Sequence, residues 1–564
     1  MSDSQSLAVM QSPMKIVTVE QMRDLERAAA AHGVSYAQLM DNAGHAVAHW
    51  LRMTLPPDCQ ILVLVGPGNN GGDGLVAARY LRGFGFSVFA YCCARQSGDD
   101  SNWPLAHHAG VIMARCEEDQ QGIQLRRWVE DCGCIVDAVL GTGTTRPIAS
   151  PLRDVLDVVR SAVALRRRPF SNQELRWLHP LTGQSEGKPL VIVAVDVPSG
   201  LNANTGALDQ ATLTADFTIT FGYPKMGLFR FPGAAKVGKL AVADIGIPDE
   251  FAHDIALEVT SPDLVASALP LRPLDAHKGT FGKVLVVAGS TSFTGAASLA
   301  AQGAMRVGAG LVTLAIPAVL HPVIGANVSE STYLLLPHEQ GNISADAADT
   351  LRPHLPLYDV LLLGPGIGRA TTTVEFVSRL LAMRSSTTER VPRLVLDADG
   401  LYALSVIPKW TKCVDSESIL TPHPGEMARL MATDISRVEA SRVQVAQQSA
   451  KESNATIVLK GAFSVVASPQ GTTYINPFAV PTLATAGSGD VLAGVVAGLL
   501  AQGAPIRAAA IAGAYLHGLA GQMLCEETGL SGAIASDLLP LIPAAWRRLV
   551  SAHPAPTTTR TKAA

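Results

Sequence analysis

The sequence predicts an α/β protein of two domains, each built on a mainly parallel sheet with helices on both faces. Apolar segments of strand length alternate with segments of helix length along most of the 564 residues, a pattern typical of strands joined by helical crossovers. The pattern begins again near residue 282, after a proline-rich stretch, and glycine-rich turns follow several strands. Because ligands of open α/β sheets bind at such turns, each domain is expected to carry a site.

The first domain is expected over residues 15–250. Two amphipathic helices within 19–51 precede the apolar run ILVLV and its glycine-rich loop, and a helical segment follows at Leu75–Arg82. The later strands are expected at Ser87–Cys92, Ile135–Leu140, Leu190–Val195, Phe217–Phe221 and Lys239–Ala243. The polar, aperiodic stretch 162–189 interrupts this order and indicates a surface insertion.

Clustered prolines separate the two domains and predict a linker at 251–271. The second domain is expected over 272–548, followed by a disordered polar tail at 549–564. It opens with the strand in GKVLVVAGS, contains a hairpin at 464–475, and closes with a long Ala/Gly-rich helical region from Asp490 to Cys525. The strands between are expected at Leu311–Ile316, Val360–Leu363, Leu394–Leu396 and Thr456–Leu459.

Composition excludes several classes of function. The net charge is −4 with no strongly basic face, which argues against nucleic-acid binding. The longest apolar runs are shorter than the roughly 20 residues that span a bilayer, and the N-terminus lacks the pattern of a secretory signal. The eight cysteines form no CxxC pair and fit a reducing compartment. We therefore expect a cytoplasmic protein without nucleic-acid or membrane partners.

Polar residues crowd the glycine-rich loop Gly66–Gly74. Glycines allow the backbone to approach a ligand closely, and the helix start that follows offers free N–H groups to a phosphate. The loop differs from the dinucleotide pattern GxGxxG. A tight turn is the structural alternative, but a turn does not require Asn69, Asn70 and Asp73.

Two other strands of this domain carry an acid and end at glycine-rich turns. Asp137 lies in the apolar run before Gly141–Pro147, and Asp196 begins the turn DVPSG. Burial of a carboxylate is costly unless the group is paired, and one such acid is usually a structural hydrogen-bond acceptor. Two acids at the ends of separate strands indicate a shared pocket, which could hold a hard cation.

Taken in order, NNGGDG, VDAVLGTG, VDVPSG and FGYPKMGL resemble the motifs of the YjeF N-terminal family, the epimerases of hydrated NAD(P)H, or NAD(P)HX. The resemblance spans residues 15–250 and implies a Rossmann-like αβα sandwich. It implies that Asn70, Asp137 and Ser199 ligate a potassium ion, and that Asp196 and Lys225 are catalytic. The residues implied to contact the substrate are Asn69, Asn70, Gly71, Gly72, Asp73, Gly141, Thr142, Gly143, Thr144, Thr145, Arg146, Pro147 and Asp196.

The second domain has a comparable helix start in Thr485–Asp490. Successive backbone N–H groups there can surround a developing phosphoryl charge, and the Asp490 carboxylate can reach a substrate hydroxyl. The alternative is a helix-capping aspartate, because Asp is favoured at N-caps. Other turns keep structural alternatives too: His423 as a rigid-turn residue, GPGIG at 364–368 as an ordinary turn, and Asp397 and Asp399 as structural acceptors.

The motifs KGTFGKVLVVAGS, GPGIG, DADG, TPHPGE, LKG and AGSGD resemble those of the ADP- or ATP-dependent NAD(P)HX dehydratases, which have a ribokinase-like fold. The resemblance spans 272–548 and implies hydrate contacts from Ala296, Gly366, His423 and Asp490, with Asp490 as the catalytic base. A magnesium ion would stabilise the transferring phosphoryl group. Tyr402 stands where the family often has Asn, so no contact is carried over to it. The implied nucleotide-binding residues are Lys460, Gly461, Ala462, Phe463, Ser464 and Gly489.

Together the two resemblances imply a bifunctional repair enzyme. The first domain would epimerise the R and S forms of NADHX and NADPHX, and the second would dehydrate the S form with ADP, giving AMP and phosphate. The alternative is a small-molecule kinase of the ribokinase-like class, fused to a non-catalytic YjeF N-terminal interaction module. A kinase would leave a stable phosphorylated product, whereas a dehydratase releases phosphate. We also expect a homo-oligomer.

Overall fold

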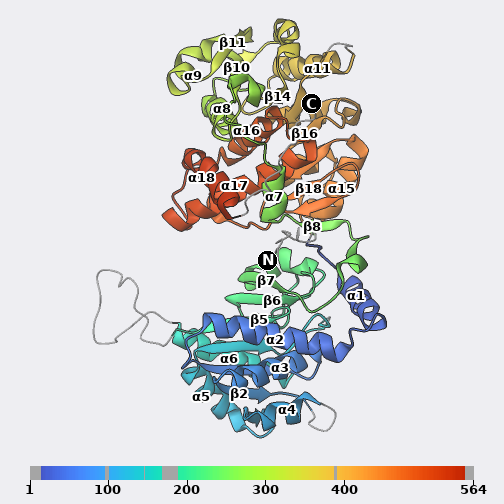
Figure 1. Ribbon diagram of the computed structural model, residues 1–564. Coiled ribbons are helices and arrows are strands. Elements are labelled where there is room, and N and C mark those ends of the chain that lie inside the picture. Colours follow the sequence, from blue (N-terminus) through green and yellow to red (C-terminus); the bar gives the residue numbers. More distant parts are fainter. Residues whose placement is uncertain (1–13, 96–100, 145, 168–188, 387–389, 553–564) are drawn as a thin grey trace, which may run out of the picture. The chain divides into compact units, whose positions relative to one another are not determined.

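The computed structural model describes residues 14–95, 101–144, 146–167, 189–386 and 390–552 (Figure 1). Within these residues the chain forms two compact units, one over Lys15–Ile255 and the other from Ala256 onward together with Met14. Thr145 and most of the expected insertion lie outside the described residues. The first residues of the expected insertion, 162–166, belong to a helix that runs to Arg166, so this part of the prediction is wrong.

The first unit is built on a seven-stranded parallel sheet of order β3-β2-β1-β4-β5-β6-β7. The strand order reverses between β1 and β4, and a crevice for ligands opens at the carboxyl ends of the strands at such a point. The elements are α1 (Val19–Ala31), α2 (Tyr36–Thr54), β1 (Gln60–Val65), α3 (Asn69–Gly83), β2 (Ser87–Cys92), α4 (Asn102–His108), β3 (Ile112–Arg115), α5 (Ile123–Asp131), β4 (Cys134–Ala138), α6 (Leu152–Arg166), β5 (Val191–Val195), β6 (Phe217–Phe221) and β7 (Lys239–Ala243).

Helices cover both faces of this sheet because the strands are apolar on both sides. Leu62 and Leu64 of β1 belong to one buried cluster with residues of α5 and α6. Val63, which points to the other face, lies against Gly74 of α3. The nearly continuous apolar run of β1 is therefore the signature of a strand buried on both sides.

The second unit has a ten-stranded sheet of order β11-β10-β9-β14-β15-β16-β17-β18-β19-β8. The strands from β11 to β17 are parallel, and β18 pairs antiparallel with both neighbours, which confirms the predicted hairpin. The strands are β8 (Leu257–Val259), β9 (Lys283–Val287), β10 (Leu311–Pro317), β11 (Thr332–Leu336), β14 (Val360–Leu363), β15 (Arg393–Leu396), β16 (Ser418–Leu420), β17 (Thr456–Leu459), β18 (Val465–Ala467) and β19 (Thr473–Ile475), beside a separate pair of β12 (His338–Glu339) and β13 (Asn342–Ile343).

Helices α8, α16, α17 and α18 share one large buried cluster with β9 and β14. The predicted helical region from Asp490 to Cys525 consists of two helices, because Gly503 and Pro505 separate α16 from α17. The helices are α7 (Pro262–Ala268), α8 (Thr294–Arg306), α9 (His321–Asn327), α10 (Ala347–Leu351), α11 (Thr371–Ser386), α12 (Asp399–Val406), α13 (Pro424–Leu430), α14 (Ile435–Ala440), α15 (Arg442–Ser453), α16 (Ser488–Ala501), α17 (Ile506–Thr528) and α18 (Leu538–Ala552).

Two boundary predictions are wrong. The expected linker 251–271 contains β8, which pairs with β19, and α7, which packs on α17, so most of it belongs to the second unit. The expected tail begins too early, because α18 continues to Ala552 and buries Leu549. Prolines mark these segments in the sequence, but the side chains between them are apolar enough to be buried.

One helix of the second unit, α17, is long and apolar enough to cross a membrane by length and composition. In the structure, however, 78% of its most apolar window is buried. It packs against α16 and α18, which makes it a core helix of the unit.

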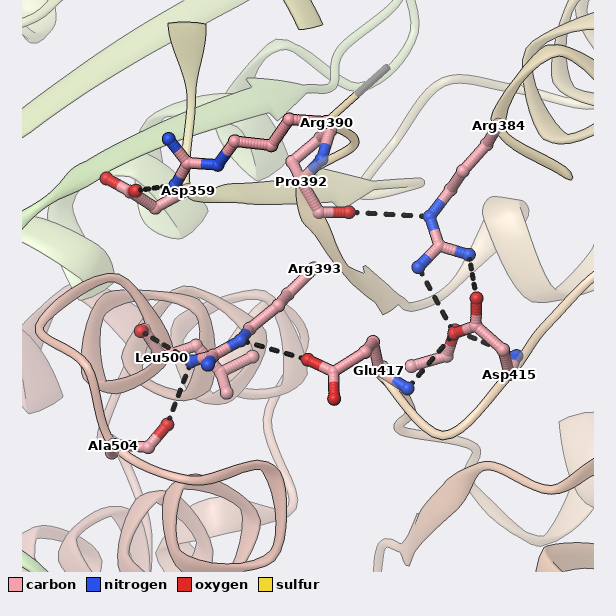
Figure 2. A network of polar contacts seen from close by, with 10 residues as sticks. Asp359, Arg384, Arg390, Pro392, Arg393, Asp415, Glu417, Leu500 and Ala504 are labelled. Atoms are coloured by element: carbon pink, nitrogen blue, oxygen red, sulfur yellow. Dashed lines mark hydrogen bonds and ion pairs between the residues drawn. The ribbon is translucent and has the colours of Figure 1, made fainter. Parts of the chain in front are cut away.

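An ion-pair network joins the amino ends of β14, β15 and β16 (Figure 2). Arg393, the first residue of β15, donates to Glu417 at 3.1 Å and to the carbonyl of Ala504 at 3.2 Å, beyond the end of α16. Arg384, whose side chain is 4% exposed, pairs with both carboxylate oxygens of Asp415 at 2.9 and 3.2 Å. This edge of the sheet is thus occupied by protein groups, and the opposite, carboxyl edge carries the motifs.

Candidate active sites

A cavity of about 980 Å³ lies at the crevice of the first unit. Residues from turns far apart in the sequence line it together, but Asp137 and Ser199 are not among them, so the cavity is not shared by Asp137 and Asp196 as predicted. The predicted residues that line it are Asn69, Asn70, Asp73, Gly141, Thr142, Gly143, Thr144, Arg146, Pro147, Asp196 and Lys225.

The glycine-rich loop differs from the prediction, because Asn69–Asp73 is the first turn of α3. A Cβ on Gly66 would lie 1.8 Å from the carbonyl oxygen of Val139, and one on Gly71 would lie 2.0 Å from that of Gly66. A Cβ on Gly72 would lie 2.8 Å from the Met40 side chain. Gly66 and Gly71 thus allow backbone segments to pack closely, and neither Gly71 nor Gly72 lines the cavity.

Asp196 and Lys225 form a buried ion pair at the cavity wall. The Lys225 ammonium lies 2.5 Å from Oδ1 of Asp196 and also donates to the hydroxyl of Thr220 and the carbonyl of Phe221. Lys225 is 1% exposed and Asp196 9%. Asp196 follows β5 with φ of 64°, a left-handed backbone conformation that non-glycine residues seldom adopt outside functional sites. The pair places the Asp196 carboxylate and the Lys225 ammonium group at the cavity wall where the substrate is expected to bind.

Asp137 and Ser199 meet behind the turn at Leu140. The Ser199 hydroxyl lies 2.6 Å from Oδ1 of Asp137, and the Ser199 N–H donates to Oδ2 at 3.0 Å. Asn70 lies against Gly141, and its buried amide nitrogen has no hydrogen-bond partner among the described residues. Burial raises the pKa of Asp137, while the hydrogen bonds from Ser199 lower it. The oxygens of these three residues are of the types that a hard cation takes as ligands. However, both oxygens of Asp137 accept from Ser199, and the open atom of Asn70 is a nitrogen, which is a donor and not a ligand.

Two carboxylates besides Asp196 face this cavity. Burial and the neighbouring carboxylates of Asp196 and Glu26 raise the pKa of Asp73 well above its ordinary value. Burial also raises the pKa of Glu26, an α1 residue that the sequence analysis missed. The signal was its spacing, because Glu26 follows Val19 and Met22 on the buried stripe of α1.

In the second unit, the turn before α16 places Asp490 in the first turn of the helix. Gly487 occupies the N-cap position with φ of 89°, so Asp490 is not the capping residue. Burial raises the pKa of Asp490 to about 7, and the carboxylate of Asp397 contributes, against the ammonium of Lys460. A carboxyl group with this pKa can accept a proton near neutral pH.

Lys460 joins the carboxylates around Asp490. Its ammonium lies 2.5 Å from Oδ1 of Asp397 and 3.7 Å from Glu426. The Thr421 hydroxyl donates to the same Asp397 oxygen at 2.8 Å, whereas the buried Oδ2 has no partner among the described residues. A Cβ on Gly489 would lie 3.2 Å from the ammonium and 3.9 Å from Oδ2, so Lys460, Asp397 and the α16 helix start converge. A cation or its water would satisfy the open oxygen.

The implied hydrate residues gather at the carboxyl edge of β9, β14 and β16. A Cβ on Gly366, which has φ of 63°, would lie 2.8 Å from the Cβ of Ala296. His423 caps α13, since its Nδ1 accepts from the N–H groups of Gly425 and Glu426. The structural alternative for His423 thus holds, although its side chain is 56% exposed and can still meet a ligand.

The implied nucleotide segment, residues 460–464, joins β17 to β18. Gly461 has φ of 138°, which requires glycine, and its carbonyl accepts from the Ser464 hydroxyl at 2.9 Å. Arg442 donates to the carbonyls of Leu459 and Lys460, and these hydrogen bonds stabilise the turn. Phe463 also has a positive φ, 53°. The turn, which includes Ala462, thus has a specific backbone conformation, and the ammonium of its Lys460 lies close to Gly489.

Comparison with known proteins matches both halves. The family model described as YjeF-related protein N-terminus matches residues 36–227, and the model described as NAD(P)H-hydrate dehydratase matches residues 284–544. A bifunctional NAD(P)H-hydrate repair enzyme of Moorella thermoacetica is 37% identical over 95% of this chain and 97% of its own. One of Thermofilum pendens is 34% identical, with the same shares.

The chain belongs to the bifunctional NAD(P)H-hydrate repair enzyme family. Among solved structures, an ADP/ATP-dependent NAD(P)H-hydrate dehydratase of Bacillus subtilis, co-crystallised with ATP and Mg²⁺, is 28% identical. It covers 52% of this chain and 98% of its own, with a TM-score of 0.43. Membership of this family confirms the enzyme predicted from the motifs.

Proposed function

We propose that the first unit epimerises hydrated NAD(P)H and that the second dehydrates the S hydrate with ADP, giving NAD(P)H, AMP and phosphate. The observation that carries the proposal is the environment of Asp490. Its carboxylate, with a pKa raised to about 7, lies near the Lys460 ammonium at the start of α16. Both the base and the N–H groups for phosphoryl transfer are thus present at one helix end.

In the first unit, inversion at C6 requires the ring to open and reclose on the other face. Asp196 takes the proton of the C6 hydroxyl as the C6–N1 bond breaks, so that C6 becomes an aldehyde and the electron pair of the bond moves to N1. After rotation of the aldehyde, N1 attacks its other face, the C6–N1 bond re-forms, and Asp196 returns the proton to the oxygen. Lys225 stabilises the Asp196 carboxylate and fixes its position through the 2.5 Å contact. A potassium ion held by Asn70, Asp137 and Ser199 would add positive charge beside the turn at Leu140.

In the second unit, Asp490 removes the proton of the C6 hydroxyl, whose oxygen attacks the terminal phosphorus of ADP and displaces AMP. The C6–O bond then breaks to release phosphate, and loss of a C5 proton restores the ring double bond. The N–H groups of Gly487 and Gly489 stabilise the transferring charge, whereas that of Ser488 donates to the carbonyl of Thr485 at 3.3 Å. A magnesium ion held through the open oxygen of Asp397 would neutralise phosphate charge.

The test uses the full chain with mixed R and S hydrates and ADP, and it follows both reduced cofactor and free phosphate. Wild type is expected to recover the cofactor completely, and Asp196→Asn only the fraction that starts as S. Asp490→Asn is expected to lose dehydration by about 100-fold or more while it still epimerises. A stable phosphorylated product without phosphate release would favour the kinase alternative.

We also propose a cytoplasmic location. None of the eight cysteines, all of which lie within the described residues, forms a disulfide bond, which fits a reducing compartment. Fractionation of the cells that make the protein tests this. Assembly into a homo-oligomer stays a prediction, which sedimentation of the purified chain would check.

A further inference from the structure

Three side chains from neighbouring elements form a cationic cluster in the second unit. Tyr402 on α12 contacts Arg369, from the turn after β14, and Arg429 on α13. The guanidinium carbon of Arg369 lies 4.7 Å from the centroid of the Tyr402 ring, and that of Arg429 lies 5.4 Å from it. Both distances are those of cation–π contacts. Neither the motifs nor the family resemblance assigns a role to any of the three.

The two arginines are differently anchored, but both can meet a ligand. Arg369 donates through Nε to Oδ1 of Asp399 at 2.9 Å, and its side chain is 54% exposed. Asp399 accepts from the N–H of Gly368 through its other oxygen, which ties the turn to α12. Arg429 is exposed and has no carboxylate partner within the described part of the chain. Its guanidinium is therefore positioned by the Tyr402 ring and remains uncompensated.

The cluster borders the implied hydrate site. Gly366 precedes Arg369 in the same turn, and His423 begins the helix that carries Arg429. The inner site is acidic, because the carboxylates of Asp397, Glu426 and Asp490 surround the Lys460 ammonium, and Asp399 lies near Asp490. A polyanionic dinucleotide needs positive charge where it enters such a site, and exposed guanidiniums on the border supply it.

We propose that Arg369, Tyr402 and Arg429 form a subsite for a phosphate group of the hydrated dinucleotide. The Tyr402 ring aligns two guanidiniums, and guanidinium binds phosphate through paired N–H donors. The inference rests on the proposed dehydratase activity. Both hydrates carry a pyrophosphate, and NADPHX carries a 2′-phosphate as well, so the ligand chemistry has two sources. The subsite follows β14, β15 and β16, whereas the nucleotide segment follows β17, which favours the hydrate over ADP.

The test is steady-state kinetics of the full chain with S-NADHX, S-NADPHX and ADP varied in turn. Arg429→Gln is expected to raise the KM for hydrate about tenfold, the usual effect of losing one charge-assisted hydrogen bond. A rise for NADPHX alone assigns the 2′-phosphate, and a rise for both hydrates assigns the pyrophosphate. Tyr402→Leu is expected to raise the same KM, and Tyr402→Phe to raise it less, because the ring is kept.

Arg379→Gln is the matched control, since Arg379 is exposed on α11 and pairs there with Glu375. It is expected to leave each KM within about twofold of wild type, below the 1.4 kcal/mol that a tenfold change represents. An unchanged hydrate KM in Arg429→Gln, or a rise confined to ADP, overturns the inference. Failure of wild type to dehydrate either hydrate would instead contradict the proposed function, so the two failures are distinguishable.

Discussion

Asp490→Asn is expected to stabilise the second unit at the same time as it removes dehydration. The pKa of Asp490 rises from 3.8 to about 7, first through burial and then through the carboxylate of Asp397. The ionised carboxylate is therefore less favourable in the folded than in the unfolded chain. A rise of about three pH units corresponds to about 4 kcal/mol at about 1.4 kcal/mol per unit. Solvent access to the side chain reduces this figure. We therefore expect the free energy of unfolding of the second unit to be about 2 kcal/mol higher in Asp490→Asn than in wild type at pH 8.

The sign of the pH dependence follows from proton uptake. Between pH 3.8 and about 7 the folded protein binds a proton at Asp490 that the unfolded chain has lost, so wild-type stability falls as pH rises through this window. The amide that replaces this carboxyl group in the variant does not titrate. The gain from Asp490→Asn is therefore expected to be largest above pH 7, smaller at pH 5, and absent below about pH 3.8.

Urea unfolding at pH 5 and pH 8 measures this difference, with the transition of the second unit identified by its shift on ADP binding. Asp349→Asn is the matched control, because Asp349 is 62% exposed on the surface of the same unit. An Asp490→Asn variant no more stable than wild type at pH 8 would refute the reasoning. An equal gain at both pH values would also refute it.

Three further outcomes are expected. The kcat/KM of dehydration should fall about tenfold per pH unit below the Asp490 pKa of about 7, and a profile that stays flat from pH 8 to pH 5 would exclude this residue as the base. Lys225→Met should destabilise the first unit by about 3 kcal/mol, because it leaves the Asp196 carboxylate buried without its cation. Urea unfolding of this variant and of Lys225→Met/Asp196→Asn checks this, since the double variant should lose less free energy of unfolding than the single variant. Arg384→Leu should destabilise the second unit by about 2 kcal/mol at pH 7. Burial raises the pKa of Asp415, but the hydrogen bonds and charge of Arg384 outweigh it and lower the value below 3.8. The contribution of the pair is therefore lost as pH falls through that lowered pKa, and a variant effect that is the same at pH 7 and at acid pH would contradict this account.

Much of the fold could be predicted because burial on both faces leaves a local signature. The limits of Ser87–Cys92, Phe217–Phe221, Val360–Leu363 and Thr456–Leu459 were predicted as the structure has them, since each is an apolar run between polar turns. The strands that were missed, β3, β8, β11, β12, β13 and β16, are less distinct. Ile112–Arg115 is short and partly exposed, and Ser418–Leu420 has only three residues. Runs so short carry little periodicity.

The side chains that carry the chemistry, Asp196, Asp490 and those of the polar turns, can be recognised from local pattern, because apolar runs end at them. Their surroundings depend on the folded chain. It assigned Gly66 and Gly71 to backbone packing, made His423 a helix cap, brought Glu26 to the cavity, and placed Tyr402 against two arginines from other elements. The reason is that strand periodicity depends on residues close together in the sequence, whereas pKa, charge pairing and close packing depend on residues far apart in it.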